Sequence, residues 1–196
     1  MLREKLSHFN VILASGSPRR QQFFKDLDLD FEIRLKEVEE IFPDHLKAEE
    51  ITDFLADLKS KPFDQELKKN DLLITSDTIV WLNNTALGKP KNYDQAFNML
   101  KSLSNTTHDV ITSVSIKSKD FQHIINDITK VYFKEISSEE IDYYIKTYQP
   151  FDKAGAYGIQ EWIGKIGIDK IEGSYFNVMG LPVHKLYKEL LLLETS

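Results

Sequence analysis

A short turn with two serines and two arginines is the first stretch of the sequence that could do chemistry. In LASGSPRR (13–20), an apolar run passes through Ser15 to Pro18, where a helical pattern begins. The first turn of a helix has unpaired N–H groups and a partial positive charge, so it attracts anions. Arg19 and Arg20 add guanidinium donors that suit phosphate. We therefore predict a polyphosphate cradle here, with two solvated arginines on an ordinary helix as the alternative.

A single carboxylate in an apolar run is the second such feature. The stretch 71–81, DLLITSDTIVW, is typical of a buried strand, yet Asp77 and Thr78 lie within it. An unpaired buried carboxylate is costly, so Asp77 needs a cation, a metal ion or hydrogen bonds. At the carboxyl end of a strand in an α/β fold, it could act as a metal ligand or general base. The alternative is an aspartate that caps a turn at the end of the strand.

Other charged residues could complete a metal and phosphate site. The acidic run 37–40 is by itself typical of a solvated face, but near Asp77 it could supply a second carboxylate for Mg²⁺, which prefers oxygen ligands. Lys59 is unremarkable alone. Lys89 lies in a stiff loop beside a proline, which suits a charge that must be held in place.

A glycine-rich stretch, DKAGAYGIQ (152–160), could contact a flat ring. Its two glycines allow close backbone approach or a positive φ. Gln160 can donate and accept hydrogen bonds, so it could recognise the edge of a nucleobase. A tight loop between elements is the alternative.

The elements that must position these residues are predicted from periodicity and turn signals. Strands are expected at 9–14, 30–35, 71–81, 109–118, 124–134 and 165–171, and helices at 18–27, 47–60, 93–103, 138–147 and 181–193. Asn83 and Asn84 mark a hairpin turn. Because some strands alternate with helices and others are adjacent, we expect an α/β fold with a mixed sheet, in one domain that could form two lobes.

Composition excludes several classes of protein. The chain of 196 residues has a net charge of −6, which argues against broad attraction to nucleic acid or an anionic membrane. It has no cysteine, which excludes disulfides and thiolate chemistry and is compatible with the cytoplasm, the location we expect. No apolar run is long enough to span a membrane. An RNA-binding module is disfavoured because the aromatic residues follow core spacing rather than basic runs.

Taken together, these stretches resemble the Maf family of nucleotide pyrophosphatases. The resemblance covers about residues 11–190 in the family's order. The motifs that carry it are LASGSPRR (13–20), SDTIV (76–80), LGKP (87–90), LSNTTHDVITSV (103–114), DKAGAYGIQ (152–160) and IEGSYFNVMGLP (171–182).

The resemblance implies an elongated mixed sheet flanked by helices, with a central cleft, as in inosine-triphosphate pyrophosphatases. It implies hydrolysis of a nucleoside triphosphate to the monophosphate and pyrophosphate with a divalent cation, Mg²⁺ or Mn²⁺, and a homodimer. By motif, Asp77 matches the proton acceptor and also a metal ligand. The remaining matches are the specificity positions Arg19, Thr78 and Gln160 and the charged positions Glu40, Lys59 and Lys89.

The stretch KAGAYGIQ resembles the branch of the family that acts on dTTP and UTP, so pyrimidine nucleoside triphosphates are the expected substrates. Two departures stand out: Thr75-Ser76 precedes the Asp-Thr pair, and EWIGKIGIDK follows Gln160. A nucleotide-binding regulator of septum formation and cell division, without significant turnover, is the alternative function.

Overall fold

The computed structural model describes residues 1–193, and the chain in it divides into two compact units. Among the described residues, unit 1 contains 1–77, 112–127 and 180–193. Unit 2 contains residues 78–111 and 128–179. The division between Asp77 and Thr78 falls inside a strand, so these two neighbours in the sequence belong to different units.

The elements follow one another as helices and strands in mixed order. Their bounds are α1 (Leu2–Lys5), β1 (Asn10–Leu13), α2 (Pro18–Asp26), β2 (Glu32–Ile33), α3 (Glu49–Ser60), η1 (Lys61–Phe63), β3 (Asp71–Leu82), β4 (Thr85–Leu87), α4 (Tyr93–Leu103), β5 (Thr107–Lys117), β6 (Gln122–Phe133), α5 (Ser138–Tyr148), η2 (Ala154–Ala156), α6 (Trp162–Gly167), β7 (Ile168–Glu172), α7 (Tyr175–Val178) and α8 (Val183–Leu192).

The strands of residues 1–193 form a seven-stranded sheet with the hydrogen-bonded order β2-β1-β3-β5-β6-β7, and β4 pairs with β3. β1 is parallel to both β2 and β3, whereas the β3–β4 and β6–β7 pairs are antiparallel. The predicted mixed sheet flanked by helices is therefore confirmed. The central cleft stays a prediction.

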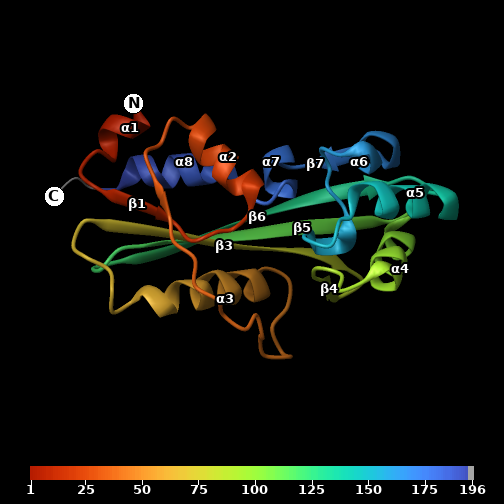
Figure 1. Ribbon diagram of the computed structural model, residues 1–196, viewed down its shortest axis with the longest axis horizontal. Helices are drawn as coiled ribbons and strands as arrows, with labels where there is room; N and C mark the ends of the chain where they lie inside the picture. Colours follow the sequence, from red (N-terminus) through yellow and green to blue (C-terminus); the bar gives the residue numbers. More distant parts are fainter. Residues whose placement is uncertain (194–196) are drawn as a thin grey trace. The chain divides into compact units, whose positions relative to one another are not determined.

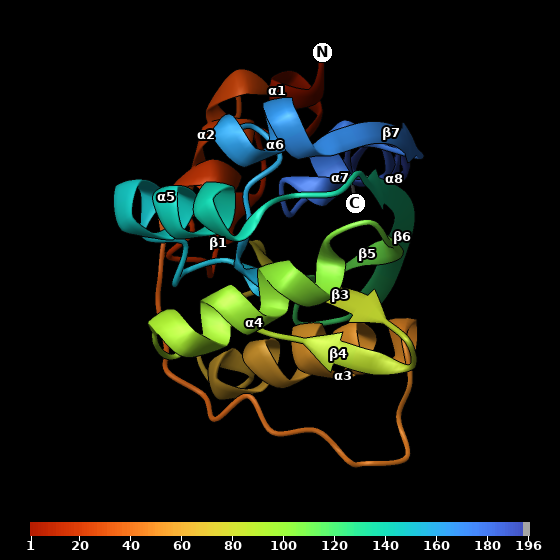
Figure 2. The ribbon, with the colours of Figure 1, turned by 90° about the vertical axis from the view of Figure 1, so that its right-hand side faces the viewer.

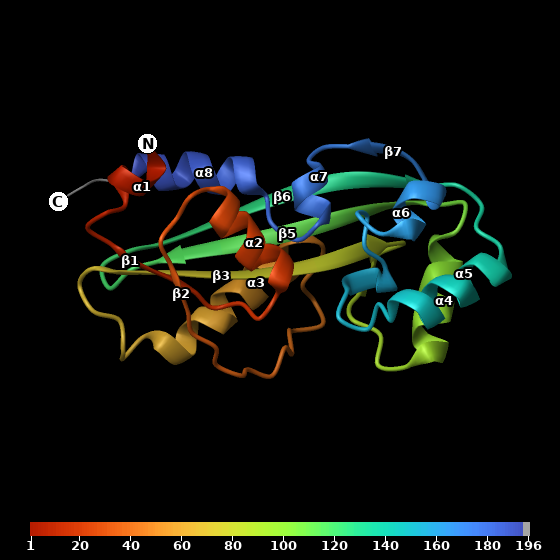
Figure 3. The same cartoon turned by 45° about the horizontal axis from the view of Figure 1, so that its top comes forward.

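In unit 1, helices cover both faces of the strands. Figure 1 shows α3 on one face, with α1, α2 and α8 on the other. Figure 3 shows α1 beside α8, and these two helices are in contact. Ile12, Phe63, Leu67 and Leu73 form a buried apolar cluster in this unit, which fixes the strands whose ends carry the polar turn.

In unit 2, α4 packs against α5 and η2, and Figure 2 shows α4 lying beside β4. Both helices begin at side-chain caps: the side chain of Asn92 accepts from the Gln95 N–H, and Ser137 forms a capping box with Glu140. Leu100 and Tyr144 are fully buried in the large core cluster of this unit. The core thus anchors α5 beneath the glycine-rich segment.

Three local expectations can be judged against these bounds. The Asn83-Asn84 turn is confirmed, since both residues have positive φ and the turn joins β3 to β4. The strand expected at 30–35 is only the two residues of β2. The strand expected at 165–171 is wrong in its first half, because residues 165–167 finish α6 and the strand occupies 168–172.

Among the helices in residues 1–193, none has both the length and the apolar composition that crossing a membrane requires.

Candidate active site

The turn after β1 is held by its own serines. Ser17 is the N-cap of α2, and its side chain accepts from the Arg20 N–H at 3.5 Å, while Pro18 occupies the first turn. Ser15 is buried, and its hydroxyl accepts from the Ser17 N–H at 3.3 Å. The first turn of α2 contains no acidic residue. No side chain within that turn therefore neutralises the partial positive charge at the start of α2.

Arg20 does not extend from the helix into solvent. Its Nε donates to the Gly180 carbonyl at 2.8 Å and its Nη1 donates to the Ser76 carbonyl at 2.8 Å. Burial lowers the pKa of the Arg20 guanidinium to about 10, although the charges of Asp77 and Glu40 favour its protonated form. Arg20 therefore remains charged at neutral pH and joins the start of α2 to β3.

Parallel pairing explains why two distant motifs meet in unit 1. β1 and β3 pair from Asn10↔Asp71 to Leu13↔Ile74. Because the two strands are parallel, the residues that follow Leu13 and those that follow Ile74 leave the pairing at the same end. The serine-arginine turn follows the end of β1, and Asp77 follows three residues after Ile74. Asp77 therefore lies beyond the parallel part of β3 but within the strand, so the alternative of a turn-capping aspartate is wrong.

Lys59 binds two carboxylates. Its Nζ is 2.6 Å from Asp77 Oδ1 and 3.1 Å from Glu40 Oε1. The Asp77 side chain is 8% exposed and that of Lys59 is 17% exposed, while Glu40 is 44% exposed. Lys59 lies in the last turn of α3, where the helix dipole favours a cation. The buried carboxylate therefore has the cationic partner that its burial requires.

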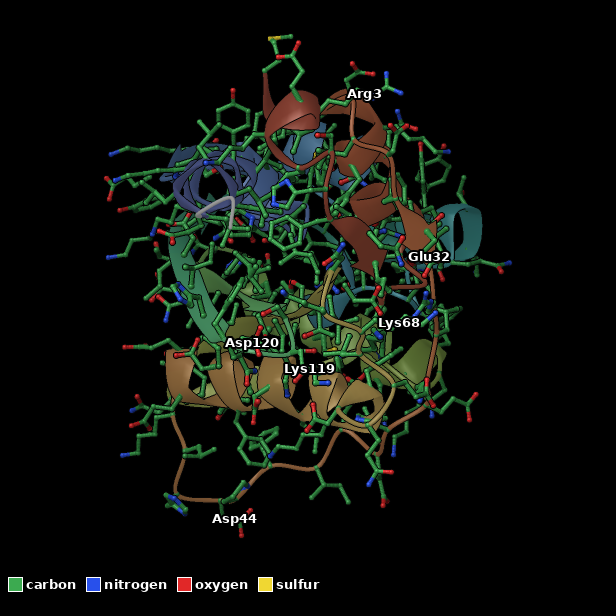
Figure 4. The ribbon with its side chains drawn as sticks, turned by 90° about the vertical axis from the view of Figure 1, so that its left-hand side faces the viewer. Arg3, Glu32, Asp44, Lys68, Lys119 and Asp120 are labelled. Carbon is green, nitrogen blue, oxygen red and sulfur yellow. The ribbon has the colours of Figure 1, made fainter. Side chains whose placement is uncertain are left out.

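Glu40 reaches this pair from a long loop. Residues 34–48 have no helix or strand, and Figure 4 shows Asp44 at the outer end of this loop. Lys36 anchors the start of the loop, because its Nζ donates to the Pro62 carbonyl at 2.7 Å and contacts Glu66 at 2.5 Å. Glu37, Glu39 and Glu40 are all exposed, but Glu40 also pairs with Lys59, so the solvated-face interpretation does not describe Glu40 fully.

The donor set suits a cation that keeps other ligands. Within residues 1–193 there is no group of three His, Asp or Glu side chains placed to hold a metal ion. Glu40 and Asp77 are two carboxylates that already share the ammonium group of Lys59 and lie near the charge of Arg20. Mg²⁺ usually takes one or two carboxylates from a protein and completes its shell with phosphate and water. The pair therefore fits such an ion.

In unit 2, Lys89 and the glycine-rich segment are joined through the backbone. The Gly155 N–H donates to the Gly88 carbonyl at 3.1 Å. Gly155 has φ +66°, and a Cβ there would lie 2.7 Å from a Val80 methyl group, so only glycine fits without a shift. Lys89, one residue after Gly88, is exposed, and Thr78 is half-buried. The pair of glycines in the segment is the sequence feature that predicted this close approach of its backbone to neighbouring residues.

Gln160 ends the segment at a pocket in unit 2. The pocket has a volume of about 360 Å³, and its walls include Gln160, Lys165, Asp169 and Tyr175. Among residues 1–193, Gln160 Oε1 is one of the few buried side-chain oxygens without a hydrogen-bond partner. Buried polar atoms normally have partners, so this oxygen is an acceptor whose hydrogen-bonding capacity is unmet.

A cluster that the sequence analysis missed supports this segment. Lys153 Nζ is 2.7 Å from Asp152 Oδ1 and 3.2 Å from Glu161 Oε1. The Tyr144 hydroxyl donates to the other oxygen of Glu161 and accepts from the Gly158 N–H at 3.1 Å. Burial, and then the hydrogen bond to Glu161, raise the pKa of Tyr144, so its hydroxyl stays protonated. The only sequence signal for this cluster was Tyr144 on the apolar face of α5, because the hydroxyl of a buried tyrosine needs a hydrogen-bond partner.

A second buried pair joins Tyr157 of this segment to His108 of β5. His108 Nε2 and the Tyr157 hydroxyl are 2.8 Å apart, and both rings also contact Phe133 edge to face. Burial lowers the pKa of His108 to about 4 and raises that of Tyr157. Both side chains are therefore neutral at pH 7.

The predicted residues divide between the units. Unit 1 contains Ser15, Arg19, Arg20, Glu40, Lys59 and Asp77, and hydrogen bonds join Arg20 and Lys59 to the 76–77 segment. Unit 2 contains Thr78, Lys89 and Gln160. The arrangement in unit 1 can bind an anion, hold a cation and take up a proton, whereas the one in unit 2 can recognise a neutral hydrogen-bonding edge.

A family model and curated relatives match nearly the whole chain. A family model described as Maf-like protein matches residues 10–193. A Flavobacterium johnsoniae protein named dTTP/UTP pyrophosphatase is 65% identical over 97% of this chain and 98% of its own length. A Christiangramia forsetii protein of the same name is 57% identical over 97% of both chains. Among solved structures, the Staphylococcus aureus Ham1 protein matches with a TM-score of 0.47 and 18% identity, over 63% of this chain and 71% of that one.

Proposed function

Because the chain belongs to the Maf family, which the match over residues 10–193 establishes, we propose that it hydrolyses dTTP and UTP to the monophosphate and pyrophosphate. Relatives up to 65% identical over nearly the full chain are named dTTP/UTP pyrophosphatase. The observation that carries the proposal is the meeting of Arg20, Lys59 and Asp77 in unit 1. These groups combine a helix start, two cations and a carboxylate, which is a phosphate-hydrolysing set.

The residues of unit 1 hold and cleave the triphosphate. The N–H groups at the start of α2 and the guanidinium of Arg19 bind its phosphate oxygens, while Arg20 fixes the turn against β3. Asp77 accepts a proton from the water that attacks the α-phosphorus, and the bond from that phosphorus to the bridging oxygen breaks. Pyrophosphate leaves with that oxygen, and the positive groups stabilise its charge.

Glu40 and Asp77 would hold a divalent cation, Mg²⁺ or Mn²⁺, which would polarise the α-phosphate when bound. Lys59 and Lys89 balance the remaining negative charge of the substrate. This assignment is supported by the two carboxylates that converge on Lys59 in unit 1.

The residues of unit 2 select the base. Uracil and thymine share an edge on which two carbonyl oxygens flank one N–H. Gln160 Oε1 is a buried acceptor without a partner among the described residues, so it can accept that N–H while the amide nitrogen donates to a carbonyl. Thr78 supplies a further hydroxyl. The methyl group of thymine is not on this edge, which accounts for the use of both bases.

Hydrolysis in ¹⁸O-labelled water tests the reaction. Purified protein is incubated with UTP or dTTP and Mg²⁺ or Mn²⁺, and products are followed by ³¹P NMR. We expect pyrophosphate and a monophosphate that carries the label, because water attacks the α-phosphorus. Release of inorganic phosphate, or label in pyrophosphate, would contradict the proposed cleavage. Binding without turnover would instead support the regulator of septum formation.

The homodimer that the family resemblance implies can be tested by light scattering on the same preparation. A mass near twice the 22.8 kDa of one chain is the expected result. A mass of one chain would contradict it.

A further inference from the structure

Lys59 occupies the position that the proposed function gives to a cation. Its ammonium group is 2.6 Å from Asp77 and 3.1 Å from Glu40, the two carboxylates that would hold the divalent ion. These three side chains come from three separate elements: α3, β3 and the 34–48 loop. A metal ion that binds both carboxylates closely must compete with Lys59 for their oxygens.

We propose that Lys59 acts as a placeholder cation, so that the free protein takes up the divalent ion together with the nucleotide rather than before it. The inference rests on the proposed function. In the free protein, Lys59 keeps Glu40 and Asp77 together and compensates their charge. A triphosphate gives the ammonium group new oxygen partners, which releases both carboxylates for the ion.

The burial of the three groups supports this exchange. Asp77 is 8% exposed, so its carboxylate is stable only with a positive partner, and Lys59 provides one before any ligand arrives. Lys59 is 17% exposed, and its ammonium group lies at the end of a long flexible side chain. This group can therefore turn to a phosphate without a movement of α3. Glu40 is 44% exposed and lies on a loop, so it can shift toward an ion.

Thermodynamic linkage makes the inference quantitative. If the triphosphate draws Lys59 away, it must raise the affinity for the ion, and the ion must raise the affinity for the triphosphate by the same factor. Removing the ammonium group should therefore strengthen the binding of the ion to the free protein. It should weaken the binding of metal-free triphosphate.

The experiment measures Mn²⁺ binding to the free protein by electron paramagnetic resonance, without nucleotide. Lys59→Met removes the competing charge and keeps the length of the side chain. We expect its affinity for Mn²⁺ to rise at least about tenfold over the wild type, the scale on which one close charge shifts a carboxylate equilibrium. Lys59→Arg, which keeps the charge, should stay close to the wild type.

Lys61→Met is the matched control for overall charge. Lys61 lies two residues further along, is half-exposed and pairs with Asp57 rather than with Glu40 or Asp77. A rise in Mn²⁺ affinity that is equal in Lys61→Met and Lys59→Met would show a general charge effect and overturn the inference. Unchanged affinity in Lys59→Met would overturn it as well.

A second variant keeps the test decisive if Lys59→Met does not fold. Lys59→Gln retains a donor to Asp77 but no charge, and thermal unfolding first establishes that each variant is folded. The same rise in affinity is expected for it. Because the readout requires no turnover, failure of this inference is separate from failure of the proposed function, which the labelled-water assay reports.

Discussion

Each unit of the molecule contains a lysine between two carboxylates, at nearly equal distances. Lys59 of unit 1 lies 2.6 and 3.1 Å from its partners, and Lys153 of unit 2 lies 2.7 and 3.2 Å from Asp152 and Glu161. Their surroundings differ. In unit 2, the hydroxyl of buried Tyr144 also binds Glu161, and the neighbouring residue Asp152 supplies the other oxygen.

The difference separates a static cluster from an exchangeable one. In unit 2, Tyr144 and a backbone N–H hold the cluster, so it can only fix the segment that ends in Gln160. In unit 1, Lys59 links the carboxylates of two further elements, β3 and the 34–48 loop, beside a helix start that attracts anions. The two clusters therefore have similar ion-pair distances but different roles. The Lys153 cluster of unit 2 fixes the shape of its segment, whereas Lys59 of unit 1 can change partners.

The largest expected effect is on turnover. Asp77→Asn keeps the shape of the side chain and removes the proton acceptor in unit 1, so kcat for UTP should fall about 10²- to 10⁴-fold. Asp71→Asn is the matched control, because Asp71 is also buried in β3 but bonds to Asn10 and the Lys68 N–H. Steady-state pyrophosphate release measures both. A near-normal kcat for Asp77→Asn would remove this residue from the chemistry.

Stability should distinguish the two lysines next. Lys153 is 9% exposed, and Lys153→Met leaves the carboxylate of Glu161 half-buried beside Tyr144, so unfolding free energy should fall by about 3 kcal/mol. Lys59→Met should lose less than this, because the positive charge of Arg20 remains near Asp77 and because Glu40 is open to solvent. Urea unfolding at pH 7 gives both values. Equal losses would mean that the two clusters do not differ as argued.

The sequence predicted the start of α2 and the position of Asp77 because both follow from local rules. Ser17 before Pro18 fixes a helix start, and a carboxylate in an apolar run needs a partner. The cluster of Lys153, Glu161 and Tyr144 could not be predicted, since its members come from α5 and from both ends of the glycine-rich segment and meet only by packing.

The error at 165–171 has a similar origin. Alternating residues over so short a stretch fit the last turn of a helix as well as a strand. Gly164 decides the outcome: a Cβ there would lie 1.9 Å from the Ile159 carbonyl oxygen, so the chain doubles back closely at this point. That contact depends on the backbone turn between residues 159 and 164, which the alternation of residues 165–171 does not contain.

Lowering the pH should reduce the stability of unit 2 through His108, a buried side chain that is neutral in the folded protein. The pKa of His108 is lowered by burial to about 4, from an ordinary value of 6.5 in the unfolded chain. Below pH 6.5 the unfolded chain takes up this proton and the folded chain does not. Its contribution to stability is therefore complete above pH 6.5 and is lost between pH 6.5 and 4, by about 3 kcal/mol in total.

Urea unfolding of the wild type and of His108→Gln at pH 7 and pH 4.5 measures this contribution. The wild type should lose more stability than the variant over this interval. His184→Gln, which changes an exposed histidine, should lose as much as the wild type. Parallel losses in the wild type and His108→Gln would show that His108 is protonated in the folded protein.

Selectivity for the nucleobase should change when the glycine-rich segment loses the side-chain amide of Gln160. Gln160→Leu removes the buried acceptor, so kcat/KM for UTP should fall about ten- to hundredfold, which corresponds to roughly 1–3 kcal/mol. CTP serves as the control substrate, because it lacks the ring N–H of uracil. Its kcat/KM should change less, so the UTP/CTP ratio should narrow. An unchanged ratio would place base selection elsewhere in unit 2.

The smallest effect concerns the two ends of α2 in unit 1. Arg19 lies in the first turn, where a cation is disfavoured, and its charge also opposes that of Arg20. Lys25 is in the last turn, where a cation is favoured. Arg19→Ala should therefore raise the free energy of unfolding by about 0.3–1 kcal/mol, and Lys25→Ala should lower it by a similar amount.

Arg19→Ala should also weaken triphosphate binding, which calorimetry with a non-hydrolysable UTP analogue measures, whereas Lys25→Ala should leave it unchanged. A residue that lowers stability and raises affinity is kept for its ligand, because a bound anion offsets its unfavourable position at the start of the helix. If Arg19→Ala lost both stability and affinity, Arg19 would belong with the fixed contacts of the fold, and the exchangeable cluster of unit 1 would not extend to the helix start.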